Sequence, residues 1–216
     1  MKISKITQAL LLVSAVAIVL DLARLDVWGT TDLLYLIWNL FLAWIPYVIS
    51  FYFIKKDSSM KRFLPIFIIW FLFFPNAPYL VTDVLHIANR LPSILWYDSL
   101  LFFLFGWIGL LLGMLSLSNV HQYFKAHFSY WMSEIIILVI CLISSFGIYL
   151  GRFGRLNSWD LFAQPQELWK HSSDFLANLF HPGTEVAFVG VFTIFMYLVY
   201  RTVYILIREN IGNDEK

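Results

Sequence analysis

Two short segments carry charged residues whose types and spacing could do chemistry. Asp83 and His86 lie three positions apart, and Arg152 and Arg155 have the same separation later in the chain. Residues at i and i+3 share one face of a helix. A carboxylate beside an imidazole can bind a metal or act as an acid–base pair, and two guanidiniums can hold a phosphate or carboxylate. The segments predict a site for an anionic or polar ligand, with structural ion pairing as the alternative.

Five further polar residues complete the candidate ligand-binding set: Asn39, Asn76, Asp98, Asn157 and Asp160. No metal is expected, because no Cys/His cluster has zinc-site spacing. The alternative is a divalent ion held by Asp83, His86 and Asp98. The chain contains no P-loop, G-x-S-x-G or H-E-x-x-H motif, so the pattern identifies neither a catalytic residue nor a cofactor.

The composition is that of an integral membrane protein. Hydrophobic residues make up 60% of the 216 residues and charged residues only 13%, against about 45–50% and about 25% in soluble domains. The net charge of +1 gives no basic field for nucleic acid. The single cysteine, Cys141, cannot form an internal disulfide.

Six apolar stretches are long enough to cross a bilayer as helices. They predict an all-α bundle, one polytopic domain over 1–216, with spans at about 6–25, 33–54, 63–85, 99–117, 132–150 and 186–207. With both termini in the cytoplasm, ten of the fifteen Lys and Arg residues fall on the cytoplasmic side. The alternative for the first span is a signal peptide cleaved after "AVA", at 15–17, although the apolar run continues beyond it.

The third span contains two prolines, Pro75 and Pro78, which both lack the N–H that a helix needs. We expect a break, with one helix to about Phe74 and a second from about Ala77, capped by Asn76. The second helix would begin inside the membrane with free N–H groups, which suits an anion or substrate site. The alternative is a plain proline kink.

Polar side chains in three spans are expected at one depth, by the rise of about 1.5 Å per helical residue. They are Asn39, Asn76, Ser144 and Ser145, and they predict a buried polar layer: a pocket floor or simple hydrogen-bonding contacts.

The remaining polar residues do not predict a functional site. Asp21 and Arg24 mark the interfacial end of the first span. Glu134 reads as a lone acid, and His121 and His127 as loop residues without acidic partners. The apolar period of residues 165–180 is typical of an amphipathic helix lying on the external membrane surface between the last two spans.

Three motifs carry a family resemblance: "WNLFLAWIP", "FFPNAPYLVTDVLH" and "GRFGRLNSWD". In this order and spacing they resemble a family of bacterial multi-spanning proteins known as domain of unknown function 1361. The resemblance covers about residues 30–205. It implies a multi-pass protein of the bacterial cytoplasmic membrane, and it implies no activity and no functional residue.

Three functions fit the sequence. The leading hypothesis is a membrane protein whose external polar site binds an anionic envelope component, such as a precursor, or a transported solute. The alternatives are an enzyme of envelope lipid or polymer modification and a non-catalytic scaffold or assembly subunit. The expected partners are the lipid bilayer and such an envelope component, with no nucleic acid.

Overall fold

The computed structural model describes residues 4–29, 31–89, 92–156, 163–178 and 183–214. Over these ranges the chain is helical, and no strand occurs in them. The helices are α1 (Lys5–Trp28), α2 (Tyr35–Phe53), α3 (Met60–Phe73), α4 (Asn76–Tyr79), the 3₁₀ helix η1 (Leu80–Asn89), α5 (Leu95–His127), α6 (Tyr130–Phe153), α8 (Pro165–Ala177) and α9 (Thr184–Asp214).

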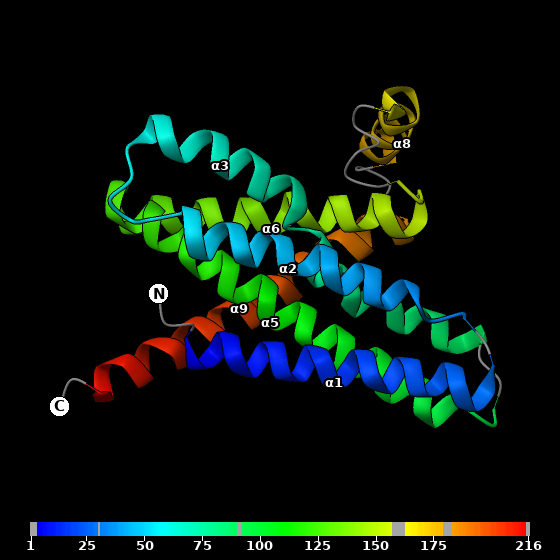
Figure 1. The fold of residues 1–216 in the computed structure, drawn as a ribbon. Helices are drawn as coiled ribbons and strands as arrows, with labels where there is room; N and C mark the ends of the chain where they lie inside the picture. The colour runs from blue at the N-terminus through cyan, green and yellow to red at the C-terminus, as the bar shows by residue number, and fades with distance from the viewer. Residues whose placement is uncertain (1–3, 30, 90–91, 157–162, 179–182, 215–216) are drawn as a thin grey trace.

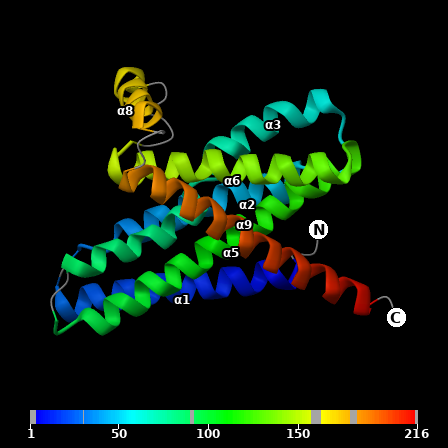
Figure 2. The ribbon, with the colours of Figure 1, turned by 180° about the vertical axis from the view of Figure 1, so that it is seen from behind.

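Six segments are long and apolar enough to cross a membrane, so the predicted all-α bundle of six spans is confirmed. They are Lys5–Trp28, Tyr35–Phe53, Met60–Ala88, Leu95–His127, Tyr130–Phe153 and Thr184–Ile207. The start of α1 and the end of α9 lie at the same end of the bundle in both ribbon views (Figures 1 and 2). We call this the His121 end, and we call the opposite end, where α6 finishes, the Arg152 end.

α5 runs through the middle of the bundle (Figure 2) and is the most buried of the six spans. It packs against α1, α2, α4, η1, α6 and α9. Its 33 residues extend ten beyond the predicted end at 117. Polar residues near this predicted boundary have buried partners: Ser116 Oγ accepts a 2.7 Å bond from Trp70 Nε1, and Asn119 Nδ2 donates to Ser50 Oγ at 3.2 Å. A polar side chain whose hydrogen bonds are made can be buried, so the helix can continue through it.

Three glycines on α5 let it approach α4 and η1 closely. A Cβ on Gly109 would lie 2.4 Å from the Ala77 carbonyl oxygen, and one on Gly106 or Gly113 would have its nearest atom at 3.3 Å. Small residues of this kind allow membrane helices to pack backbone against backbone. The glycines therefore fix α4 and η1 on the central helix.

The third span changes its hydrogen bonding at the prolines. α3 ends at Phe73, and Phe74 and Pro75 keep right-handed dihedrals before α4 begins. The predicted capping role of Asn76 is wrong: it is the first residue of α4, and its amide donates to the Phe73 carbonyl at 2.9 Å. The segment beyond is a ten-residue 3₁₀ helix. A functional break in the membrane stays a prediction.

α8 coincides with most of the predicted amphipathic segment, at Pro165–Ala177. Phe175 is buried and contacts Phe146 and Tyr149 of α6, with ring centroids 4.8 and 5.7 Å apart. Trp169 and Leu176 are exposed. α8 is therefore attached to the Arg152 end of α6 (Figure 1) and carries apolar side chains that face away from it.

Gly109→Ala should destabilise the protein by about 1–3 kcal/mol, because the new methyl group overpacks the contact with Ala77. The readout is the free energy of unfolding in detergent. Gly190→Ala on α9 is the control, because nothing lies within 4 Å of its added Cβ. Equal effects of the two substitutions would contradict the close packing of α4 on α5.

Candidate functional site

Arg152, in the last turn of α6, joins the two charged segments of the sequence. One of its amino groups, Nη2, forms an ion pair with Asp83 Oδ1. Nε and Nη2 also donate to Thr82 Oγ1 at 3.0 and 2.8 Å, and Nη1 lies 2.7 Å from His86 Nε2. The side chains of Arg152 and Asp83 are only 8% and 1% exposed. This Arg152 cluster is therefore a buried ion pair with its hydrogen bonds made.

The 3₁₀ geometry of η1 explains why both partners reach one arginine. With three residues per turn, residues i and i+3 are eclipsed, so Asp83 and His86 project from the same side. α2 adds Asn39, whose Nδ2 lies 3.5 Å from Asp83 Oδ2. The Tyr79 ring covers the guanidinium with its centroid 4.5 Å from Arg152 Cζ. Four segments, α2, α4, η1 and α6, thus meet at this cluster.

The cluster limits what chemistry its members can do. A guanidinium only donates hydrogen bonds, so His86 Nε2 must accept the bond from Arg152. That nitrogen cannot act as a base while the bond exists. The two carboxylate oxygens of Asp83 are bonded to Arg152 and Asn39. The arrangement is that of a positioning ion pair rather than a free acid–base pair.

A cavity of about 870 Å³ lies beside the cluster, between α2, α3 and α4 on one side and α6 on the other. This volume is in the usual range for small-molecule sites, about 300–1,000 Å³. Its polar lining residues are Asn39, Asn76, Tyr79, His86, Arg152 and Arg155. Its apolar ones include Trp38, Phe67, Ile68, Phe71, Ile143 and Phe146. The lining is therefore mostly apolar, with polar groups concentrated toward the Arg152 end.

Arg155 differs from Arg152, although both line the cavity. It is exposed, and no ion pair joins it to a carboxylate among the residues that the structure describes. Its backbone is left-handed, with φ 55°, which costs a residue with a side chain roughly 1–2 kcal/mol. With Asp83 neutralising Arg152, the described charges at the cavity sum to +1, carried by Arg155.

Asp98 is not part of this cluster. It is buried in a bidentate pair with Arg24, with Nε to Oδ1 at 2.6 Å and Nη2 to Oδ2 at 3.1 Å. Asp21 and Arg24, expected at the interfacial end of the first span, are both buried within the protein, and α1 continues to Trp28. A charged side chain can be buried when an oppositely charged partner forms hydrogen bonds with it. The pair joins α1 to α5.

The three-ligand metal alternative is not formed in the structure. No group of three or more His, Cys, Asp or Glu with metal-binding geometry occurs in the described part of the chain. Two other members of the predicted ligand set, Asn157 and Asp160, lie outside the described residues.

The predicted polar layer is only partly assembled. Asn39 and Asn76 both line the cavity, but Ser144 and Ser145 do not. Ser145 Oγ donates to the Cys141 carbonyl at 2.8 Å and lies 3.6 Å from Met196 Sδ on α9. Its helix face thus packs on α9, so the layer does not extend through α6.

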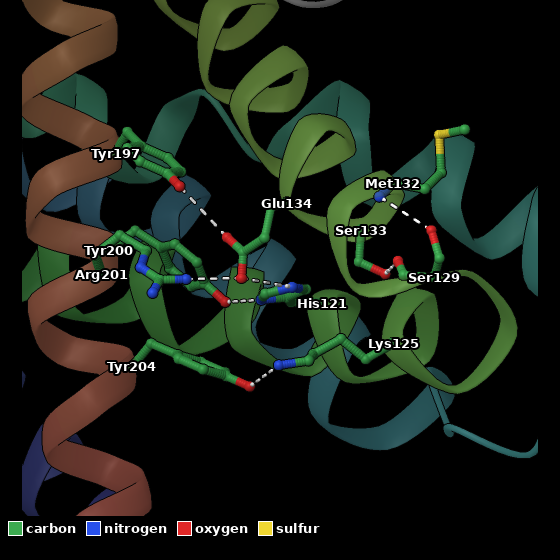
Figure 3. A network of polar contacts seen from close by, with 10 residues as sticks. All are labelled: His121, Lys125, Ser129, Met132, Ser133, Glu134, Tyr197, Tyr200, Arg201 and Tyr204. Carbon is green, nitrogen blue, oxygen red and sulfur yellow. Dashed lines mark hydrogen bonds and ion pairs between the residues drawn. The ribbon is translucent and has the colours of Figure 1, made fainter.

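Sequence reasoning missed a second polar network at the His121 end (Figure 3). Glu134 Oε1 accepts a 2.7 Å bond from Arg201 and lies 3.8 Å from His121 Nε2. Its other oxygen accepts from Tyr197 at 3.3 Å, and His121 Nδ1 is 2.5 Å from the Tyr200 hydroxyl. Glu134 is therefore not a lone acid, and His121 is a buried helical residue rather than a loop residue.

This network connects α5, α6 and α9, and Lys125 extends it by a 3.2 Å bond to Tyr204. A signal for it was present in the sequence: Tyr197, Tyr200, Arg201 and Tyr204 follow the i, i+3, i+4, i+7 pattern of one helix face. None of these residues lines the cavity. The network thus holds helices together and is separate from the candidate site.

Comparison with known proteins identifies a family whose function is not known. A family model described as "Protein of unknown function (DUF1361)" matches residues 38–199, three quarters of the chain. No curated protein and no solved structure matches this sequence. The match begins in α2 and ends in α9, and so includes the Arg152 cluster, Arg155 and the residues that line the cavity.

Arg152→Met should lower the free energy of unfolding by about 3–5 kcal/mol, because it leaves the buried Asp83 carboxylate without its cation. Adding Asp83→Leu should recover much of that loss, since it removes the orphaned charge. A double-mutant cycle in detergent measures the coupling.

The matched control for this cycle is Arg155→Gln, three positions later, which should change stability by no more than about 0.5 kcal/mol. Additive effects of the two cluster substitutions, with no coupling, would show that the ion pair does not stabilise the fold.

Proposed function

The chain belongs to the DUF1361 family, and we propose that this membrane protein binds a ligand with an anionic group in the cavity between α2, α3 and α6. The observation that carries the proposal is Arg155: an exposed guanidinium at the polar part of a cavity of about 870 Å³. Envelope precursors and transported solutes both belong to this ligand class.

The charge balance of the site supports an anion. Arg152 is compensated by Asp83, so its charge is already used within the protein. Arg155 leaves the described part of the site with one positive charge, which attracts an anion. The side-chain amides of Asn39 and Asn76 also line the cavity and can donate hydrogen bonds to oxygen atoms.

Binding fits the geometry better than acid–base catalysis does. The catalytic alternative needs Asp83 or His86 to exchange protons with a substrate. Both are instead bonded to Arg152, and Asp83 is almost fully buried. Their role in the proposal is to hold Arg152 rigidly at the cavity wall, so that the surface presented to the ligand does not change.

The proposal places both termini in the cytoplasm of a bacterium and the cavity toward the external side of its cytoplasmic membrane, in one domain. Ten of fifteen Lys and Arg residues lie on the cytoplasmic side in this orientation. The bacterial membrane follows from the resemblance of the three sequence motifs to a bacterial family.

The orientation is tested by single cysteines at Asp57→Cys and Lys170→Cys, both exposed positions. An impermeant thiol reagent added to intact cells should label position 170 and not position 57. The native Cys141 is buried, so the parent protein serves as an unlabelled control. Labelling of position 57 alone would reverse the orientation.

Anion binding is tested with inorganic phosphate at constant ionic strength, which excludes general screening effects. Phosphate should raise the melting temperature of the purified protein by a few degrees, because a ligand that binds the folded state stabilises it. Arg155→Gln should remove most of this rise, and Arg62→Gln, an exposed arginine at the His121 end, should preserve it. The same rise in all three proteins would contradict a site at Arg155.

A further inference from the structure

We infer that the ligand is an anionic lipid, which enters sideways from the bilayer, binds Arg155 through its phosphate and places its acyl chain between α3 and α6. This inference rests on the proposed function and adds the chemical class of the ligand. Three features carry it: the apolar part of the cavity, its lateral opening and the position of the charge.

Two helices that face each other, α3 and α6, build most of the apolar part of the cavity, and α2 adds Trp38 and Leu42. α3 contributes Phe67, Ile68 and Phe71, and α6 contributes Ile143 and Phe146. These side chains offer no hydrogen-bonding group to a small polar solute. They do offer close van der Waals contact to a hydrocarbon chain. A small soluble anion would contact only the polar lining of the cavity, and the apolar lining would have no role in binding it.

The lateral opening follows from how the helices pack. α3 packs on α2, whereas α6 packs on α5 and α9. α3 diverges from α6 toward the α2–α3 connection in both ribbon views (Figures 1 and 2). Ile68 and Ile143 line the cavity from opposite sides and are also large exposed hydrophobic residues on the bundle surface. In a bilayer that surface faces acyl chains, so the cavity is open to lipid.

Nearer the Arg152 end, α6 contacts the segment that directly follows α3. A Cβ on Gly147 of α6 would lie 3.6 Å from Pro75 Cγ, which is ordinary contact distance. From Ile143 to Arg152 the cavity wall follows α6 for nine residues, about 13 Å at the helical rise. A chain lying along this wall brings the headgroup to the level of Arg152 and Arg155, which both line the cavity.

The charge selects among lipids. A guanidinium binds phosphate through two parallel hydrogen bonds. A zwitterionic headgroup would bring a cation beside Arg155, and the neighbouring carboxylate of Asp83 is already paired with Arg152. The described site therefore offers no carboxylate to receive that cation, and an anionic phospholipid is the complementary occupant.

The test compares one headgroup with and without acyl chains: dioleoyl phosphatidic acid and glycerol 3-phosphate, with dioleoyl phosphatidylcholine as the zwitterionic comparison. Binding to purified protein in uncharged detergent is measured by native mass spectrometry and thermal shift. Phosphatidic acid should bind at least about tenfold more tightly than either of the other two. Arg155→Gln should remove its advantage over phosphatidylcholine.

Two neighbouring tryptophan substitutions on α6 test the position of the chain. Ile143→Trp fills the cavity, whereas Leu142→Trp does not, because Leu142 is not a lining residue; the two side chains are 48% and 46% exposed. Phosphatidic acid binding should fall about tenfold in Ile143→Trp and persist in Leu142→Trp. Ile68→Trp repeats the test from α3 if Ile143→Trp fails to fold.

The outcomes separate this inference from the proposed function. If glycerol 3-phosphate binds as tightly as phosphatidic acid, and Arg155→Gln weakens both, the lipid inference is overturned and the anion site stands. The lipid inference is also overturned if Ile143→Trp and Ile68→Trp leave phosphatidic acid binding unchanged. If Arg155→Gln changes the binding of no probe, both proposals fail.

Discussion

The buried ion pair between Arg152 and Asp83 is the interaction on which the candidate site depends. It connects the last turn of α6 to η1, two segments that are about 70 residues apart in the chain. A buried charge is stable only when it is paired and its hydrogen bonds are made. Arg152 meets this condition through Thr82 and His86 as well as Asp83. The pair therefore fixes the polar part of the cavity wall, and it leaves Arg155 as the charge available to a ligand.

The rest of the bundle can be understood as the support for this pair. The glycines of α5 hold α4 and η1 against the central helix, so the segment that carries Asp83 has a defined position. The His121 network fastens α6 to α5 and α9 at the other end. Between these two attachments α6 is not packed closely on α3, and the cavity lies there. A cavity between firmly held walls loses little conformational entropy when a ligand binds.

Much of the fold follows from the sequence, because apolar length and the absence of water in the bilayer leave helices as the available solution. The pairing of Asp83 and His86 on one face also followed from their spacing. What could not be read from one sequence was which polar residues are buried with distant partners. The pairing of Arg24 with Asp98 was not predicted, because the two residues lie 74 positions apart. Glu134 and His121 were assigned no partner for the same reason, since α9 supplies Arg201 and Tyr200.

The candidate site, too, could be predicted from the sequence only in part. The charged residues of the site could be identified from their residue types, but the separate role of each one could not. Arg152 and Arg155 lie three positions apart and carry the same guanidinium group. Arg152 is nevertheless buried in an ion pair, whereas Arg155 is exposed. The cavity itself depends on how two helices diverge, and no residue pattern encodes that directly.

The most direct test of the account is an experimental structure of the protein in nanodiscs that contain phosphatidic acid. The account predicts elongated density between α3 and α6, ending in a phosphate within about 3 Å of the Arg155 guanidinium. A cavity closed by side chains or filled with ordered water, with no lipid density at Arg155, would contradict it.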